Sequence, residues 1–69
     1  MTSNDNTIKL DQFLKAIGIA PTGGQAKLII QGGEVLVNGV LETLLGRKLK
    51  SGDSVTIAEQ TFDVNLDKL

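Results

Sequence analysis

The dipeptide Asn38-Gly39 lies between two short apolar segments and constrains the fold of this chain more than any other feature. Asparagine and glycine tolerate the positive φ angles of a two-residue type I′ turn better than other residues do. The sequence therefore predicts a β-hairpin over residues 35–40 whose register is set locally. A second turn at Gly52-Asp53 predicts the beginning of a further strand.

The length of 69 residues is enough for one small domain with one hydrophobic core. Aromatic residues make up only 3% of the sequence, so we expect leucine, isoleucine, valine and alanine to form the core around Phe13 and Phe62. We predict a single domain over residues 8–66, preceded by a disordered polar tail over residues 1–7. No internal repeat or linker divides that domain.

Two helices are predicted in the first half of the chain. Four apolar residues recur at the spacing of one helix face: Leu10, Phe13, Leu14 and Ile17. This pattern predicts a first helix that stops near Gly18. Thr22 and Gln25 have the spacing of a capping box, and an apolar stripe continues to Gly32-Gly33, so we expect a second helix there.

The second half of the chain has the pattern of short strands. Val55 with Ile57, and then Phe62 with Val64, alternate as the residues of half-buried strands do. The predicted fold class is therefore α+β, with two N-terminal helices packed on a small antiparallel sheet.

The residue types that the sequence lacks exclude several kinds of site. There is no cysteine and no histidine, so disulfides, thiolate zinc sites and histidine ligands are excluded. Serine and threonine lack the usual partner base, and the acidic residues are not spaced as a metal or carboxylate pair. We expect no enzyme activity, cofactor or metal. The polar N-terminus does not resemble a signal peptide and no stretch is long enough to span a bilayer, so we expect a cytoplasmic protein without membrane association.

The charge is polarised along the chain. Because the formal net charge is -1, any affinity for nucleic acid must come from local clustering. The candidate cations are Lys9, Lys15 and Lys27 in the first half, and a dense group of Arg47, Lys48 and Lys50 in the second. The C-terminal end is acidic instead.

Four motifs follow one another in a fixed order along residues 8 to 58. They are Ile8-Lys9-Leu10-Asp11-x-x-Leu14, Ala26-Lys27-x-x-Ile30, Gly33-x-Val35-x-Val37-Asn38-Gly39 and Gly52-Asp53. This order resembles the RNA-binding domain first known in ribosomal small-subunit protein S4. Segments 22–27, 42–43 and 46–49 are most similar to the small stand-alone bacterial members of that superfamily. The resemblance implies the S4-like, or alpha-L, fold and the binding of structured RNA of the ribosomal or transfer RNA class.

The same resemblance implies an RNA surface made by the two helices and the loop after the hairpin. Arg47 and Lys48 match the loop cations of the motif by position, Lys27 adds a charge on helix two, and Lys9 and Lys15 flank it from helix one. Arg47 is the strongest candidate, because its planar fork of donors suits phosphate oxygens. The expected RNA-binding residues are Lys9, Lys15, Gly23, Gly24, Lys27, Arg47, Lys48 and Lys50.

Each of these assignments has a structural alternative. Gly23 and Gly24 either leave backbone N–H groups open to a phosphate or only permit a tight start of helix two after Pro21. The cations are either RNA contacts or ordinary solvated surface charges. A competing function is a protein-interaction module or weak homodimer that uses an exposed patch of Leu36, Leu44 and Leu45. In that case Leu44 or Leu45 must not turn inward to complete the core.

Overall fold

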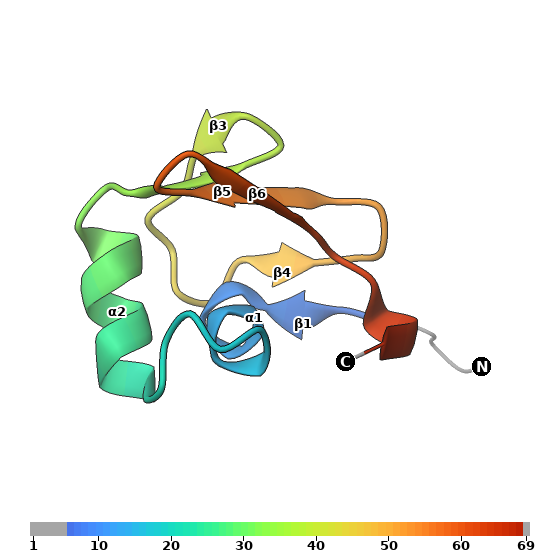
Figure 1. Ribbon diagram of the computed structural model, residues 1–69, viewed down its shortest axis with the longest axis horizontal. Helices are drawn as coiled ribbons and strands as arrows, with labels where there is room; N and C mark the ends of the chain where they lie inside the picture. Colours follow the sequence, from blue (N-terminus) through green and yellow to red (C-terminus); the bar gives the residue numbers. More distant parts are fainter. Residues whose placement is uncertain (1–5, 69) are drawn as a thin grey trace.

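The computed structural model describes residues 6–68 and folds them into two helices, a two-stranded sheet and a four-stranded sheet (Figure 1). Helices α1 (Leu10–Ala16) and α2 (Gly23–Gln31) pack against each other. This is the predicted α+β fold class. Of the predicted N-terminal tail, residues 1–5 lie outside the described part of the chain.

Local chemistry sets the helix ends where the sequence predicts them. The Thr22 side-chain oxygen accepts a hydrogen bond from the Gln25 N–H at 3.2 Å, as an N-cap residue does. Gly18 and Gly33 follow the two helices with φ angles of 82° and 80°. Glycine adopts this left-handed conformation without a Cβ penalty, so both helices stop there.

The four-stranded sheet is antiparallel and has the strand order β3-β2-β5-β6. Its strands are β2 (Val35–Val37), β3 (Val40–Leu41), β5 (Ser54–Ile57) and β6 (Gln60–Asp63). Asn38 and Gly39 have φ angles of 53° and 82°, which confirms the predicted hairpin turn. A turn at Ala58-Glu59, also with positive φ angles, joins β5 to β6.

A second, two-stranded sheet pairs β1 (Ile8–Lys9) with β4 (Lys48–Leu49). The sequence does not predict β1, because two residues are too few to show a strand period. The contact continues into α1, where the Leu10 N–H donates to the Arg47 carbonyl oxygen at 2.8 Å. A 3-10 helix, η1 (Leu66–Lys68), follows the last strand.

One apolar core joins both helices to both sheets. Figure 1 shows the four-stranded sheet on one side of the molecule and the helices with β1 and β4 on the other. The buried apolar residues are Leu10, Phe13, Leu14, Ala20, Ala26, Ile30, Val35, Val37, Leu49, Val55, Ile57 and Val64. Phe62 is half-buried and packs against them. In residues 6–68 no helix has the length and apolar character needed to cross a membrane.

Candidate nucleic-acid interface

The register of β1 and β4 places Lys9 directly opposite Lys48. The neighbouring cross-strand pair is Ile8 and Leu49, and Leu49 is fully buried in the core. Because successive side chains of a strand point to opposite faces, Lys9 and Lys48 project away from the core. Directly opposed side chains have Cβ atoms about 5 Å apart, so like charges there repel each other. We refer to Lys9 and Lys48 as the facing lysine pair.

No carboxylate neutralises the facing lysine pair in the part of the chain that the structure describes, since the single ion pair found there involves other residues. The placement also corrects the sequence prediction for Lys9, which belongs to β1 and is the N-cap residue of α1 rather than a residue of the helix. The fold therefore concentrates two positive charges at one place on the surface.

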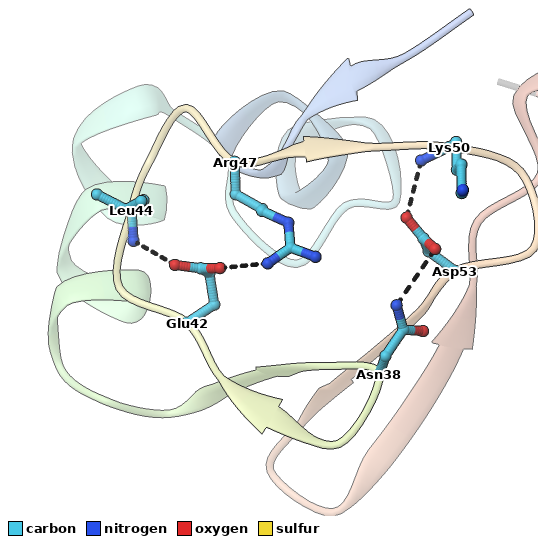
Figure 2. A network of polar contacts seen from close by, with 6 residues as sticks. All are labelled: Asn38, Glu42, Leu44, Arg47, Lys50 and Asp53. Carbon is cyan, nitrogen blue, oxygen red and sulfur yellow. Dashed lines mark hydrogen bonds and ion pairs between the residues drawn. The ribbon is translucent and has the colours of Figure 1, made fainter.

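Lys50 extends the same surface. Lys48 is exposed, Leu49 is buried and Lys50 is exposed, so Lys50 projects to the same side as Lys48. The Lys50 backbone is fixed, because its N–H donates to Asp53 Oδ2 at 3.0 Å (Figure 2). Its carbonyl oxygen also accepts from the Asp53 N–H at 3.0 Å. The Lys50 N–H is also the main reason why the pKa of Asp53 lies below its ordinary value.

Arg47 differs from Lys48 and Lys50 in that it forms an ion pair within the described residues. Its Nη1 donates to Glu42 Oε1 at 2.6 Å, and Figure 2 shows the side chain reaching from the beginning of β4 toward Glu42. The Arg47 guanidinium and, next, the Leu44 N–H lower the pKa of Glu42. The Arg47 side chain keeps 40% of its surface exposed, so it stays accessible to a ligand.

Gly23 and Gly24 form the first turn of α2, at the end of that helix away from the four-stranded sheet (Figure 1). A Cβ at Gly23 would have no neighbour within 4 Å, and one at Gly24 would meet only Thr22 Oγ1 at 3.8 Å. Neither residue has a positive φ angle. A tight start of the helix therefore gives no steric reason for glycine at either position.

The backbone donors of these two glycines remain open. Within residues 6–68 the N–H groups of Gly23 and Gly24 have no acceptor, whereas those of Gln25 and Ala26 both donate to Thr22. Free N–H groups and the positive end of the helix dipole favour an anion at this position. Lys27 lies one turn further along α2 and is exposed.

Lys15 does not join the facing lysine pair. It lies in the last turn of α1, whereas Lys9 precedes the first turn. Six residues of helix separate the two by about 9 Å along the axis. Lys15 is exposed at the negative end of the helix dipole, where a cation is stabilising whether or not it contacts a ligand.

The leucines considered as an apolar patch are not equivalent. Leu44 is 66% exposed, Leu36 is half-buried opposite Leu41, and Leu45 is half-buried and packs against the core. Leu45 thus completes the core instead of belonging to an exposed patch. The exposed large apolar residues of the described chain are Leu28, Val40, Leu41 and Leu44.

Comparison with known proteins places this arrangement in a family. Residues 1–65 match the family model of the S4 domain. The probable ribosome maturation protein RlbA of Bacillus subtilis (strain 168) is 46% identical over 50 residues, which cover 72% of this chain and 70% of that protein. The small ribosomal subunit protein uS4 of Aster yellows witches'-broom phytoplasma (strain AYWB) is 31% identical over 58 residues, which cover 84% of this chain.

A uS4 protein from Onion yellows phytoplasma (strain OY-M) has the same identity over the same length. In both uS4 proteins the match covers only 29% of the relative, so the chain corresponds to one part of each. The S4 domain is an RNA-binding domain and not an enzyme, in agreement with the sequence prediction. By the match over residues 1–65, this chain belongs to the S4 domain family.

Proposed function

We propose that this protein binds structured ribosomal RNA in the cytoplasm and takes part in ribosome maturation. The facing lysine pair is the single observation that carries the proposal. Two lysines directly opposite each other destabilise the sheet that holds them, and a phosphate group between them reverses that effect. The similarity to a probable ribosome maturation protein supports ribosomal RNA over transfer RNA.

The proposed contacts are with the RNA backbone rather than with unstacked bases. Double-helical RNA is recognised mainly through phosphates and 2′-hydroxyl groups. Phe13 is buried and Phe62 is half-buried against the core, so neither offers a flat exposed ring on which a base can stack. The shape of a folded RNA then decides specificity.

The full proposed surface has a centre and two extensions. The facing lysine pair and Lys50 form the centre, Arg47 extends it toward the hairpin, and the first turn of α2 with Lys27 binds a separate phosphate. Lys15 lies beside this surface and adds a further positive charge to it. Neutralising about three to five phosphates gives a slope of about -2 to -5 in a plot of log K against log salt concentration.

Fluorescence anisotropy of a labelled, structured ribosomal RNA fragment tests the proposal. We expect salt-dependent binding by the wild type, and a slope reduced by about 2 for the double variant Lys9→Ala/Lys48→Ala. Gln60→Glu/Thr61→Glu is the matched control, because it changes the net charge by the same amount on the exposed part of β6. Absence of binding at low salt, or equal losses in both double variants, would contradict the proposal.

Self-association is a second candidate function, favoured by the exposure of the edge strand β3. Val40 and Leu41 are 65% and 54% exposed at the end of the strand order, next to the exposed Leu44. An apolar edge strand is a common site of pairing between chains. Sedimentation equilibrium should then show a mass that rises with protein concentration, and Leu41→Lys should keep the chain monomeric. A constant monomer mass for the wild type would exclude this candidate.

A further inference from the structure

We propose that Glu42 is a positioning residue for RNA binding, which holds the Arg47 guanidinium by one nitrogen and turns its remaining donors toward a phosphate. The inference rests on the proposed function and deepens it by giving the RNA surface an acidic member. The sequence predicts only cations and two glycines as RNA-binding residues, whereas the contact that suggests Glu42 exists only in the folded chain.

The carboxylate is less exposed to solvent than the guanidinium that it holds. The Glu42 side chain is 14% exposed and the Arg47 side chain is 40% exposed, so the arginine offers the larger accessible surface to a ligand. A guanidinium carries five N–H donors in a planar fork, and in the described residues only Nη1 is engaged, with Glu42. Enough donors remain to bind two oxygens of one phosphate.

Glu42 is itself held in place through both its carboxylate and its backbone. The carboxylate Oε2 accepts from the Leu44 N–H at 3.2 Å (Figure 2). The Glu42 backbone N–H donates to the Val35 carbonyl oxygen of β2 at 2.9 Å. The Glu42–Arg47 ion pair is therefore anchored to the backbone of the fold. Because Glu42 is anchored to β2 and to the Leu44 N–H, its contact with the guanidinium restrains the otherwise flexible Arg47 side chain.

The Arg47 backbone is fixed as well. Its N–H donates to the Leu44 carbonyl oxygen at 3.2 Å, and its carbonyl accepts from the Leu10 N–H at 2.8 Å. Lys9, which precedes Leu10, belongs to the facing lysine pair. The Arg47 backbone is therefore hydrogen-bonded to the segment that carries Lys9. A side chain that is already oriented loses less conformational freedom when it binds RNA.

Two other roles for Glu42 give different results. If the ion pair only stabilised the fold, its loss would lower the free energy of unfolding, while the folded protein would keep its affinity for RNA. If Glu42 only opposed the RNA charge, replacing it with either alanine or glutamine would tighten binding. Positioning predicts instead that alanine weakens binding, while glutamine keeps an oxygen acceptor and retains most of the affinity.

A double-mutant cycle decides among these roles. Binding to a labelled, structured ribosomal RNA fragment is measured for the wild type, Glu42→Ala, Glu42→Gln, Arg47→Ala and Glu42→Ala/Arg47→Ala, with urea unfolding of each variant to confirm that it is folded. We expect Glu42→Ala to weaken binding about three- to tenfold, and to have no further effect when Arg47 is already alanine.

Tighter binding by both Glu42 variants overturns the inference, and so does an unchanged affinity or an equal loss in the Arg47→Ala background. These results leave the proposed function intact, because the wild type still binds. A wild type that does not bind even at low salt overturns the proposed function and the inference together. Recovery of affinity in Glu42→Gln but not in Glu42→Ala supports positioning.

Discussion

The Asn38 amide donates from Nδ2 to Oδ1 of the Asp53 carboxylate at 3.2 Å and joins two turns that are 15 residues apart in sequence. Asp53 Oδ2 accepts from the Lys50 N–H at 3.0 Å (Figure 2). Asn38 Oδ1 accepts from the Ser54 N–H at 2.9 Å. The contact therefore links the β2–β3 hairpin to the end of β4 and the start of β5. It holds the backbone from which Lys48 and Lys50 project.

Replacing Asp53 should destabilise the fold. Asp53 is the buried charged residue of the described chain, with 9% of its surface exposed. Asp53→Ala leaves the Lys50 N–H and the Asn38 amide without their acceptor, so we expect the free energy of unfolding to fall by about 1–3 kcal/mol. Urea denaturation measures this change. Asp63→Ala, at an exposed position of β6, should change it by less than about 0.5 kcal/mol, and equal effects would refute the assignment.

Stability should decline in acid for the same reason. The pKa of Asp53 is lowered from its ordinary value of 3.8, chiefly by the Lys50 N–H, so the unfolded chain binds the proton at a higher pH than the folded chain does. The stabilisation is present above the unfolded pKa and is lost as the pH falls through the folded pKa. The free energy of unfolding, measured at about one-unit intervals between about pH 2 and pH 7, should fall less steeply along the acid limb of this pH profile for Asp53→Asn than for the wild type.

Glu42 also makes the stability of the fold decline in acid, because Arg47 lowers the pKa of Glu42 from its ordinary value of 4.5. The acid limb of Asp53→Asn should therefore be reduced but not abolished. An acid limb of unchanged steepness in that variant would show that Asp53 does not carry the effect.

Removing one charge of the facing lysine pair should stabilise the protein in the absence of RNA. Lys9→Gln relieves the repulsion from Lys48, so we expect a gain of about 0.2–1 kcal/mol at low salt that vanishes at high salt. Lys15→Gln is the matched control, since it removes the same charge from the end of α1 where the helix dipole favours a cation. That variant should lose stability instead, and a gain for both would contradict the register argument.

Substitutions of Gly23 and Gly24 in α2 should lower RNA affinity without lowering the stability of the fold. Gly23→Ala and Gly24→Ala fit the space and the backbone conformation, so we expect unfolding free energies that are unchanged or higher by about 0.4–1 kcal/mol. RNA affinity should nevertheless fall, because each added Cβ stands beside an open N–H group. Gly18→Ala tests the opposite case, since its φ of 82° makes any side chain there destabilising. Unchanged RNA affinity in both α2 variants would remove the first turn of α2 from the proposed surface.

Features set by neighbours in sequence are predicted correctly. The Asn38-Gly39 turn and the Thr22 cap depend on residues within a few positions of each other, so their residue types suffice to place the hairpin and the second helix. The Ala58-Glu59 turn has the same positive φ angles but no glycine to mark it, with values of 52° and 68°. Pairing of β5 with β6 imposes that conformation, and the residue types alone do not reveal it.

The candidate site depends on more distant contacts. The sequence identifies the cations, yet it groups Arg47 with Lys48 and assigns Lys9 to a helix. The folded chain instead turns Arg47 toward Glu42 and sets Lys9 opposite Lys48. The lysine pair could be predicted only by predicting strand β1, and two residues are too few to show a strand pattern in the sequence.

The amino-acid sequence by itself determines the helices, the first hairpin, the apolar core and the S4 motif order, because propensity, capping and turn chemistry act over a few residues. Only the tertiary structure decides which charges meet. Lys9 and Lys48 are 39 positions apart in sequence, and the β1–β4 register alone makes them neighbours. The same folding turns Leu45 onto the core and leaves Leu44 in solvent, since burial there depends on what packs beside the loop and not on residue type.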